Sequence, residues 1–130
     1  MADENENEEY DDEITRKNYI NRAEKIVRNT FADAEIFHGV VNNTIAFNKD
    51  GLIFITAYGK SKLLTANDIT TVVFSPPKKG DFPMLYYCIL KINDPEMPEI
   101  KFLLSVGEET MDEATGLYFE IETRIESFKK

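Results

Sequence analysis

The stretch Thr44-Ile45-Ala46-Phe47-Asn48-Lys49-Asp50-Gly51-Leu52-Ile53-Phe54-Ile55 decides the fold. Ile45 and Phe47 alternate with smaller or polar residues, which is the two-residue period of a β-strand that buries one face. Asp50-Gly51 then predicts a hairpin turn, because glycine accepts a positive φ and aspartate favours turns. The return strand at 52–57 is apolar on both faces. We therefore expect each face to be covered by a helix, a second sheet layer or a partner chain.

Short apolar segments separated by turn residues continue this pattern on both sides of the hairpin. They predict strands at 35–41, 44–48, 52–57, 61–65, 69–74, 84–92 and 100–106. The intervals between them are short, apart from a proline-containing loop at 75–83. Mostly antiparallel pairing follows, because parallel strands need long crossover connections.

Two amphipathic helices are predicted, one at each end of the strands. After Gly107 the apolar residues recur every three or four positions, which predicts a helix over the remaining residues. Thr110 and Glu113 match a capping box, and Gly116 is expected to allow a close approach to the sheet. The segment 14–31 predicts a second helix, with an apolar stripe on one face and basic residues on the other.

The net charge of −9 is concentrated at the N-terminus. Residues 1–13 hold eight of the 24 acidic side chains and none of the 15 basic ones, so we predict a disordered acidic tail there. The remaining residues carry 16 acidic and 15 basic side chains and are nearly neutral. This distribution argues against nucleic-acid binding, which requires a basic face.

The residues that usually carry chemistry are sparse. Cys88 is the single cysteine and His38 the single histidine, so neither has a partner of its own kind for a disulfide or a metal site. We interpret both as structural residues and predict a chain that is not an enzyme and binds no cofactor or metal. The acidic N-terminus is unlike a signal peptide, which leads us to expect a cytoplasmic location.

Two segments give the chain a resemblance to the bacterial pleckstrin-homology-like domain family. Residues 46–55 are similar to the family's "leu-thr-asn-lys-arg-leu-ile-phe-val" hairpin, and residues 64–72 resemble its "ile-pro-tyr-glu-asp-ile-thr-ser-val" stretch. The resemblance implies an α+β domain at 35–130: a partly open barrel of about seven mostly antiparallel strands, capped by the C-terminal helix. The several loop bases of phosphoinositide-binding members are not reproduced here, and the candidate ligand or partner contacts are the separate loop lysines Lys49, Lys60, Lys62, Lys78 and Lys79.

The leading functional hypothesis is a non-catalytic interaction module that binds a protein partner through a sheet edge or a helix face. Self-association into a homo-oligomer is a further expectation. One alternative is peripheral recognition of anionic lipid by the basic helix. Others are a small acidic chaperone of the specialised secretion type, which the chain resembles in size and isoelectric point, and a mobile-element inhibitor that uses the acidic tail as a decoy.

Overall fold

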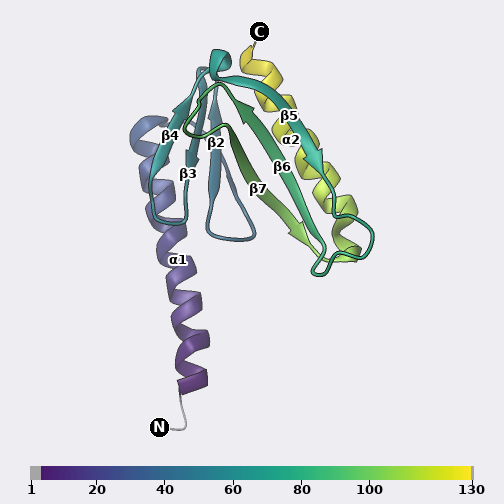
Figure 1. Cartoon of the computed structure of the whole chain (residues 1–130). Helices are drawn as coiled ribbons and strands as arrows, with labels where there is room; N and C mark the ends of the chain where they lie inside the picture. Colours follow the sequence, from purple (N-terminus) through teal and green to yellow (C-terminus); the bar gives the residue numbers. More distant parts are fainter. Residues whose placement is uncertain (1–3, 130) are drawn as a thin grey trace.

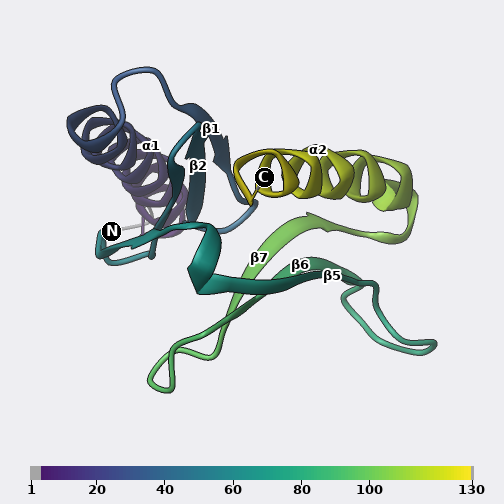
Figure 2. The same ribbon diagram turned by 90° about the horizontal axis from the view of Figure 1, so that it is seen from above.

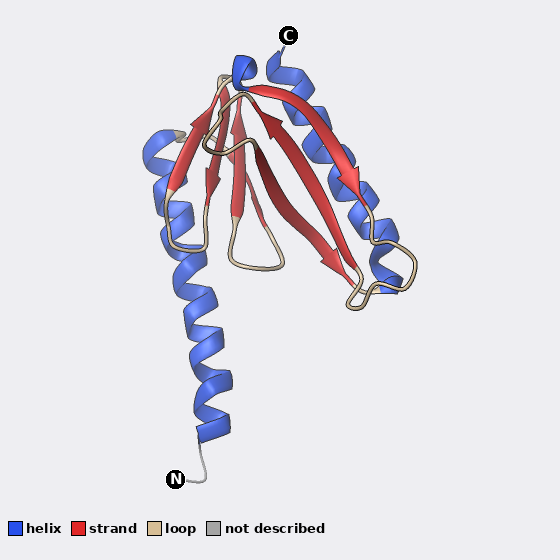
Figure 3. Ribbon diagram, in the orientation of Figure 1, coloured by secondary structure: helices blue, strands red, loops and turns tan. Residues whose placement is uncertain are grey.

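The computed structural model describes the backbone of residues 4–129 and the side chains of residues 14–128. The fold is α+β, with two antiparallel sheets and a long helix at each end of the chain (Figures 1 and 3). The elements are α1 (Glu4–Thr30), β1 (Glu35–His38), β2 (Thr44–Asn48), β3 (Gly51–Ile55), β4 (Ser61–Leu64), β5 (Ile69–Ser75), β6 (Leu85–Ile92), β7 (Glu99–Val106) and α2 (Met111–Lys129). Short 3-10 turns, Ala66–Asp68 and Glu108–Thr110, precede β5 and α2.

The first sheet has the strand order β1-β2-β3-β4, and its central hairpin forms where the sequence predicts it. The turn works differently from the prediction, because Gly51 does not have a positive φ. Instead the Asn48 side chain accepts hydrogen bonds from the backbone N–H groups of Asp50 and Gly51, at 2.8 and 3.1 Å. Glycine is required at 51 for another reason. A Cβ there would lie 2.4 Å from the Leu64 carbonyl oxygen on β4.

The doubly apolar strand β3 is covered on both faces, as predicted. Every residue of β3 is buried. Ile53 and Ile55 pack beneath α1, whereas Leu52 and Phe54 belong to a larger core shared with the second sheet and α2. The chain therefore has two hydrophobic cores, one on each side of the first sheet.

The second sheet has the order β5-β6-β7, and α2 lies in the angle between the two sheets (Figure 2). Across residues 4–129 the sheets stay separate, so the predicted partly open barrel appears only in its coarser form of two antiparallel sheets with a C-terminal helix. Packing explains the separation, because α2 occupies the space between the sheets. Its buried side chains there are Ala114, Tyr118, Ile121 and Ile125.

Two sequence predictions about α2 are wrong in detail. The Thr110 hydroxyl does not cap the helix; it donates to the Gly107 carbonyl at 2.7 Å and lies 2.9 Å from the Ser105 hydroxyl, because a 3-10 turn precedes the helix. Gly116 does not approach the sheet, since a Cβ there would have no neighbour within 4 Å.

Arg124 near the other end of α2 forms two hydrogen bonds with Glu35, which join α2 to β1. This contact lowers the pKa of the Glu35 carboxyl.

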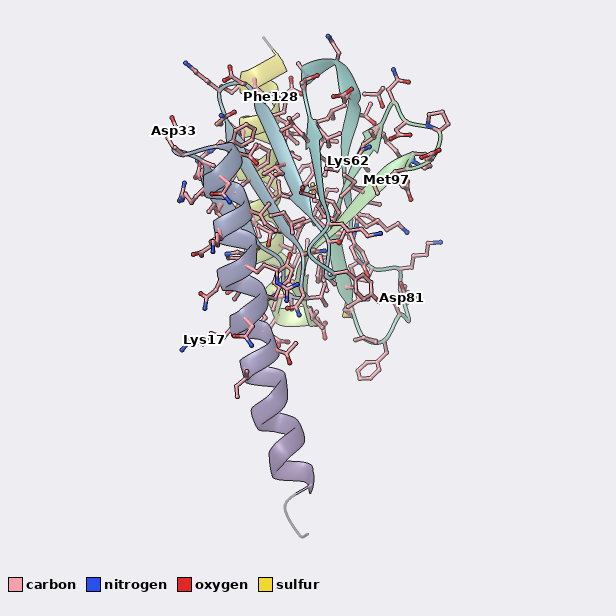
Figure 4. The ribbon with its side chains drawn as sticks, turned by 90° about the vertical axis from the view of Figure 1, so that its left-hand side faces the viewer. Lys17, Asp33, Lys62, Asp81, Met97 and Phe128 are labelled. Atoms are coloured by element: carbon pink, nitrogen blue, oxygen red, sulfur yellow. The ribbon has the colours of Figure 1, made fainter. Side chains whose placement is uncertain are left out.

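Helix α1 covers the outer face of the first sheet and then runs past it (Figures 1 and 4). Among residues 14–30 of this helix, Tyr19, Ala23 and Val27 are buried, spaced four apart as expected for a helical stripe. The helix begins at Glu4, earlier than the predicted start at 14, so residues 4–13 of the predicted disordered tail lie within it. Acidic residues in the first turns suit the positive end of the helix dipole. Residues 1–3 of that tail lie outside the described residues.

A chain of polar side chains joins α1 to the first sheet. The Tyr19 hydroxyl donates to the Ile55 carbonyl at 3.0 Å and lies 2.9 Å from the Thr44 hydroxyl, which is fully buried. His38 Nδ1 is 2.9 Å from the same Thr44 oxygen, and His38 Nε2 is 3.1 Å from Glu24. Burial raises the Tyr19 pKa. His38 thus connects a strand to a helix.

The strand β1 ends at His38, three residues before the predicted end at 41. Arg16 of α1 holds the following loop through the Gly39 and Val41 carbonyls and the Asn42 side chain, at 2.5, 3.0 and 2.8 Å.

Neither described helix is long and apolar enough to span a membrane.

The Tyr19 hydroxyl generates a stability prediction. Tyr19→Phe should lower the free energy of unfolding by about 1 to 2 kcal/mol, because it removes two buried hydrogen bonds. Urea denaturation would measure the change. Tyr58→Phe is the matched control and should have no effect, since Tyr58 is 88% exposed.

The buried thiol of Cys88 generates a second prediction. Burial raises the pKa of this thiol to about 12, and Glu122 adds to the effect. The native thiol should react with a disulfide reagent at least about a hundredfold more slowly than the unfolded chain does.

The same shift predicts how stability depends on pH. Because the folded pKa is raised, the thiol's contribution is complete below the unfolded value of about 8.5 and is lost as the pH rises toward the folded value. The free energy of unfolding should therefore fall between about pH 8.5 and 10, and Cys88→Ala should make that fall shallower. An equal slope in both proteins would contradict the prediction.

Candidate binding groove on the second sheet

Strand β6 presents opposite faces to two different environments. Tyr86, Cys88, Leu90 and Ile92 are buried against the core, as the alternation of a strand requires. Leu85, Tyr87 and Ile89 point to the other side and are half-buried. Helix α2 lies on the core side (Figure 2), and no described helix covers the outer side. An antiparallel sheet usually presents polar residues on its solvent face, so this apolar row is unusual.

A groove of about 380 Å³ lies along this outer face. We refer to it as the β6 groove. It combines the three outward residues of β6 with the β5–β6 loop, and its lining residues are Ser75, Pro76, Pro77, Lys78, Asp81, Phe82, Pro83, Leu85, Tyr87, Ile89 and Lys101. Apolar side chains form most of its wall, and two lysines lie along it.

The β5–β6 loop is fixed by its own hydrogen bonds. The Lys78 N–H donates to the Asp81 carboxylate at 2.8 Å, and the Asp81 N–H donates to the Lys78 carbonyl at 3.0 Å. Gly80 closes this turn with a φ of +91°. Phe82 follows directly and is 96% exposed. The hydrogen-bonded turn fixes the backbone just before Phe82, which lowers the backbone entropy lost on binding and favours a role as an anchor.

A second hollow, of about 430 Å³, lies on the other side of Phe82. Phe82, Pro83, Met84 and Val106 supply its apolar lining, and its acidic lining residues are Asp81, Glu108 and Glu109. The two sides of Phe82 thus differ in charge: lysines line the β6 groove, and carboxylates line the second hollow.

Lys91 and Lys101 at the far end of the outer face share one acidic partner. Both contact Glu99, and the hydrogen bond from Lys91 lowers the pKa of the Glu99 carboxyl. Since Lys101 Nζ is 3.9 Å from the carboxylate, it has no close hydrogen bond there. It is therefore available to an acidic ligand in the groove.

The five candidate lysines do not converge on one site. Lys49 lies in the β2–β3 turn, at the opposite end of β3 from Lys60 in the β3–β4 connection. Lys62 pairs with Asp94 at 2.6 Å, which lowers the pKa of the Asp94 carboxyl, and it lies apart from the loop that carries Asp81 (Figure 4). Lys78 and Lys79 belong to the β5–β6 loop, and Lys78 lines the groove. Of the five, only this pair is near the candidate site.

Sequence reasoning missed the most exposed aromatic residue of the described part. The sequence places Phe82 only in the loop at 75–83, although Gly80 and Pro83 on either side of it indicate a constrained turn. Among residues 14–128 no three His, Cys, Asp or Glu side chains are grouped to hold a metal ion.

The turn geometry generates a prediction for two glycines. Gly80→Ala should destabilise the loop by about 1 kcal/mol, because the positive φ penalises any Cβ even though the space around it is open. Gly116→Ala is the contrasting variant. It should raise the free energy of unfolding by up to about 1 kcal/mol, because that glycine is exposed within a helix. Thermal and urea denaturation would measure both changes.

Comparisons with known proteins identify no relative. No protein-family model matches the chain, no curated protein matches it, and no solved structure matches it. The functional argument therefore depends on the residues described above.

Proposed function

We propose that this chain is a non-catalytic binding module that holds an extended segment of a protein partner in the β6 groove. The observation that carries the proposal is the outward row Leu85, Tyr87 and Ile89, which meets the fully exposed Phe82. Aromatic side chains in a concave apolar surface are the usual anchors of protein recognition. The Pro76-Pro77 segment lines the same groove, and the fixed φ angles of its prolines lower the entropic cost of binding there.

We further propose a pleckstrin-homology-like scaffold for this module. Four sequential antiparallel strands, then three, then a C-terminal helix agree with the order that the hairpin at 46–55 and the stretch at 64–72 imply. In the secretion-chaperone alternative a helix stands between the third and fourth strands. The connection here, residues 56–60, contains no helix, which makes that alternative the weaker one.

The charges of the groove define the chemistry of its partner. Lys78 and Lys101 line it, and Lys79 adjoins it in the same turn, whereas Asp81 is occupied by the Lys78 backbone. The segment that fits is therefore apolar at two or more positions and acidic at its flanks. Binding to exposed lysines should weaken as salt is added.

Binding to an anionic membrane is a second candidate, favoured by one observation. Phe82 lies in the same loop as Lys78 and Lys79, and an apolar residue beside basic ones is a common membrane contact. Glu108 and Glu109 lie across the hollow from Phe82 and would oppose such a surface. We therefore rank protein binding first, and expect no sedimentation with phosphatidylserine vesicles.

Selection from a phage-displayed random peptide library tests the proposal without a known partner. Peptides retained by the wild-type chain should combine apolar and acidic residues. Phe82→Ala or Ile89→Lys should weaken the selected peptides by about tenfold or more, because each removes part of the apolar wall. Fluorescence anisotropy with the selected peptides would measure the affinities.

Tyr58→Ala is the matched control. Tyr58 is also an exposed aromatic residue, but it lies in the β3–β4 connection of the first sheet. Its removal should leave the affinity unchanged. Equal losses in the Phe82 and Tyr58 variants would refute the groove as the binding site, as would peptides without any acidic preference that bind independently of salt.

A further inference from the structure

The second hollow is largely apolar, and hydrogen bonds fix its shape. Its apolar lining consists of Phe82, Pro83, Met84 and Val106. These residues belong to the β5–β6 loop and to the end of β7, which lie together at one end of the second sheet (Figure 1). The Gly107 N–H donates to the Met84 carbonyl at 2.9 Å, so the two segments that line the hollow are joined directly.

Two adjacent carboxylates, Glu108 and Glu109, also line the second hollow. Both residues are exposed, and neither forms an ion pair with a basic side chain of residues 14–128. Glu109 lies close to the backbone, since a Cβ at Gly107 would be 3.1 Å from its Oε1 atom. The third acidic lining residue is Asp81, whose carboxylate accepts the Lys78 N–H. The hollow thus combines an apolar surface with two carboxylates that have no cation beside them among these residues.

The second hollow and the β6 groove are continuous around one side chain. Both are lined by Asp81, Phe82 and Pro83. On the groove side the charged lining includes Lys78 and Lys101. An extended segment that lies in the groove and continues past Phe82 therefore moves from a basic surface to an acidic one.

We infer that the second hollow selects the charge of the partner segment beyond Phe82, where it accepts a basic side chain with an apolar neighbour. The inference rests on the proposed function of the β6 groove and extends it to the next residues of the same segment. Opposite charges across an interface favour binding. The aliphatic stem of a lysine or arginine can pack on Met84 and Val106 while its charged end reaches a carboxylate. A guanidinium can also stack on the exposed Phe82 ring.

The same carboxylates exclude the wrong segment. A partner that is acidic along its whole length would satisfy the lysines of the groove but would place like charges against Glu108 and Glu109. Such repulsion lowers the affinity for unwanted partners and so contributes to specificity. The hollow therefore fixes the order of charges along the bound segment: acidic in the groove and basic beyond Phe82.

Parallel selections test this order. The random peptide library is selected against the full wild-type chain and against a hollow variant, Glu108→Gln with Glu109→Gln, which keeps the size of both side chains and removes their charge. Both pools should contain the apolar and acidic residues that the β6 groove binds. Only the wild-type pool should also be enriched in a basic residue beside an apolar one at one end of the peptide.

Affinities of one selected peptide then give the sign of the effect. Fluorescence anisotropy compares this peptide with a version in which glutamate replaces its basic residue. The selected peptide should bind the hollow variant about fivefold or more weakly than the wild type, because it loses two opposite charges. The glutamate version should bind the hollow variant more tightly than the wild type, because a repulsion is removed. A gain in affinity cannot result from misfolding of the variant.

Glu120→Gln with Glu126→Gln is the matched control. Both residues are exposed on α2, and they line neither the β6 groove nor the second hollow. The control loses the same charge and should bind both peptides as the wild type does. If peptides that depend on Ile89 show no basic enrichment, or bind the hollow variant and the control equally, the inference is wrong and the groove stands. If no peptide depends on Ile89, the groove fails, and this inference fails with it.

A second copy of this chain is the competing occupant, because its Lys78 and Lys79 carry the charge that the hollow accepts. Analytical ultracentrifugation distinguishes the two occupants. The hollow variant should have the same oligomeric state as the wild type. A wild-type oligomer that dissociates in the hollow variant would overturn the inference.

Discussion

The burial of strand β3 on both faces is the constraint on which the rest of this structure depends. A single packing layer cannot bury all four apolar side chains of this strand, because successive side chains point to opposite sides of a sheet. These side chains are Leu52, Ile53, Phe54 and Ile55. One cover comes from α1 and the other from α2 with the second sheet. Each terminal helix therefore covers one face of β3, and the apolar sequence of that strand indicates that both covers are needed. The polar chain from Tyr19 to Thr44 and His38 fixes α1 on its side, and the Arg124–Glu35 pair fixes α2 on the other.

A second consequence of this arrangement is that the two sheets are used unequally. In the first sheet, β2 and β3 are buried on both faces. The second gives only one face to the core, and β6 retains apolar side chains on the other. An apolar surface of this kind lowers the solubility of a protein when nothing covers it. Because it lies beside a hydrogen-bonded loop and an exposed phenylalanine, we interpret it as a binding surface.

The sequence predicted the regular elements well, because strands and helices leave a periodic record in side-chain polarity. All seven strands and both helices form in the predicted regions, although α1 begins ten residues before its predicted start and β1 ends three residues before its predicted end, and β3 is covered on both faces as its sequence predicts. Details set by tertiary contacts were not predictable. Gly51 is required by the approach of β4, Thr110 turns back to Ser105, and Gly116 faces solvent, and none of these follows from a local pattern. The groove was missed for a similar reason, since the exposure of Phe82 depends on which face of the second sheet α2 occupies. Of the five loop lysines singled out in the sequence, only Lys78 and Lys79 are near it.

The packing of α1 also determines how far the chain can be shortened from its N-terminus and still stay soluble. Beneath the helix lie Ala46, Ile53 and Ile55, a flat aliphatic strip on adjacent strands. Shortening the protein to residue 35 would uncover that strip beside the free edges of β1 and β4. Exposed apolar strands at the unpaired edge of a sheet can pair with the strands of another molecule, which leads to aggregation. Helix α1 is thus the cover that keeps this face of the first sheet out of water.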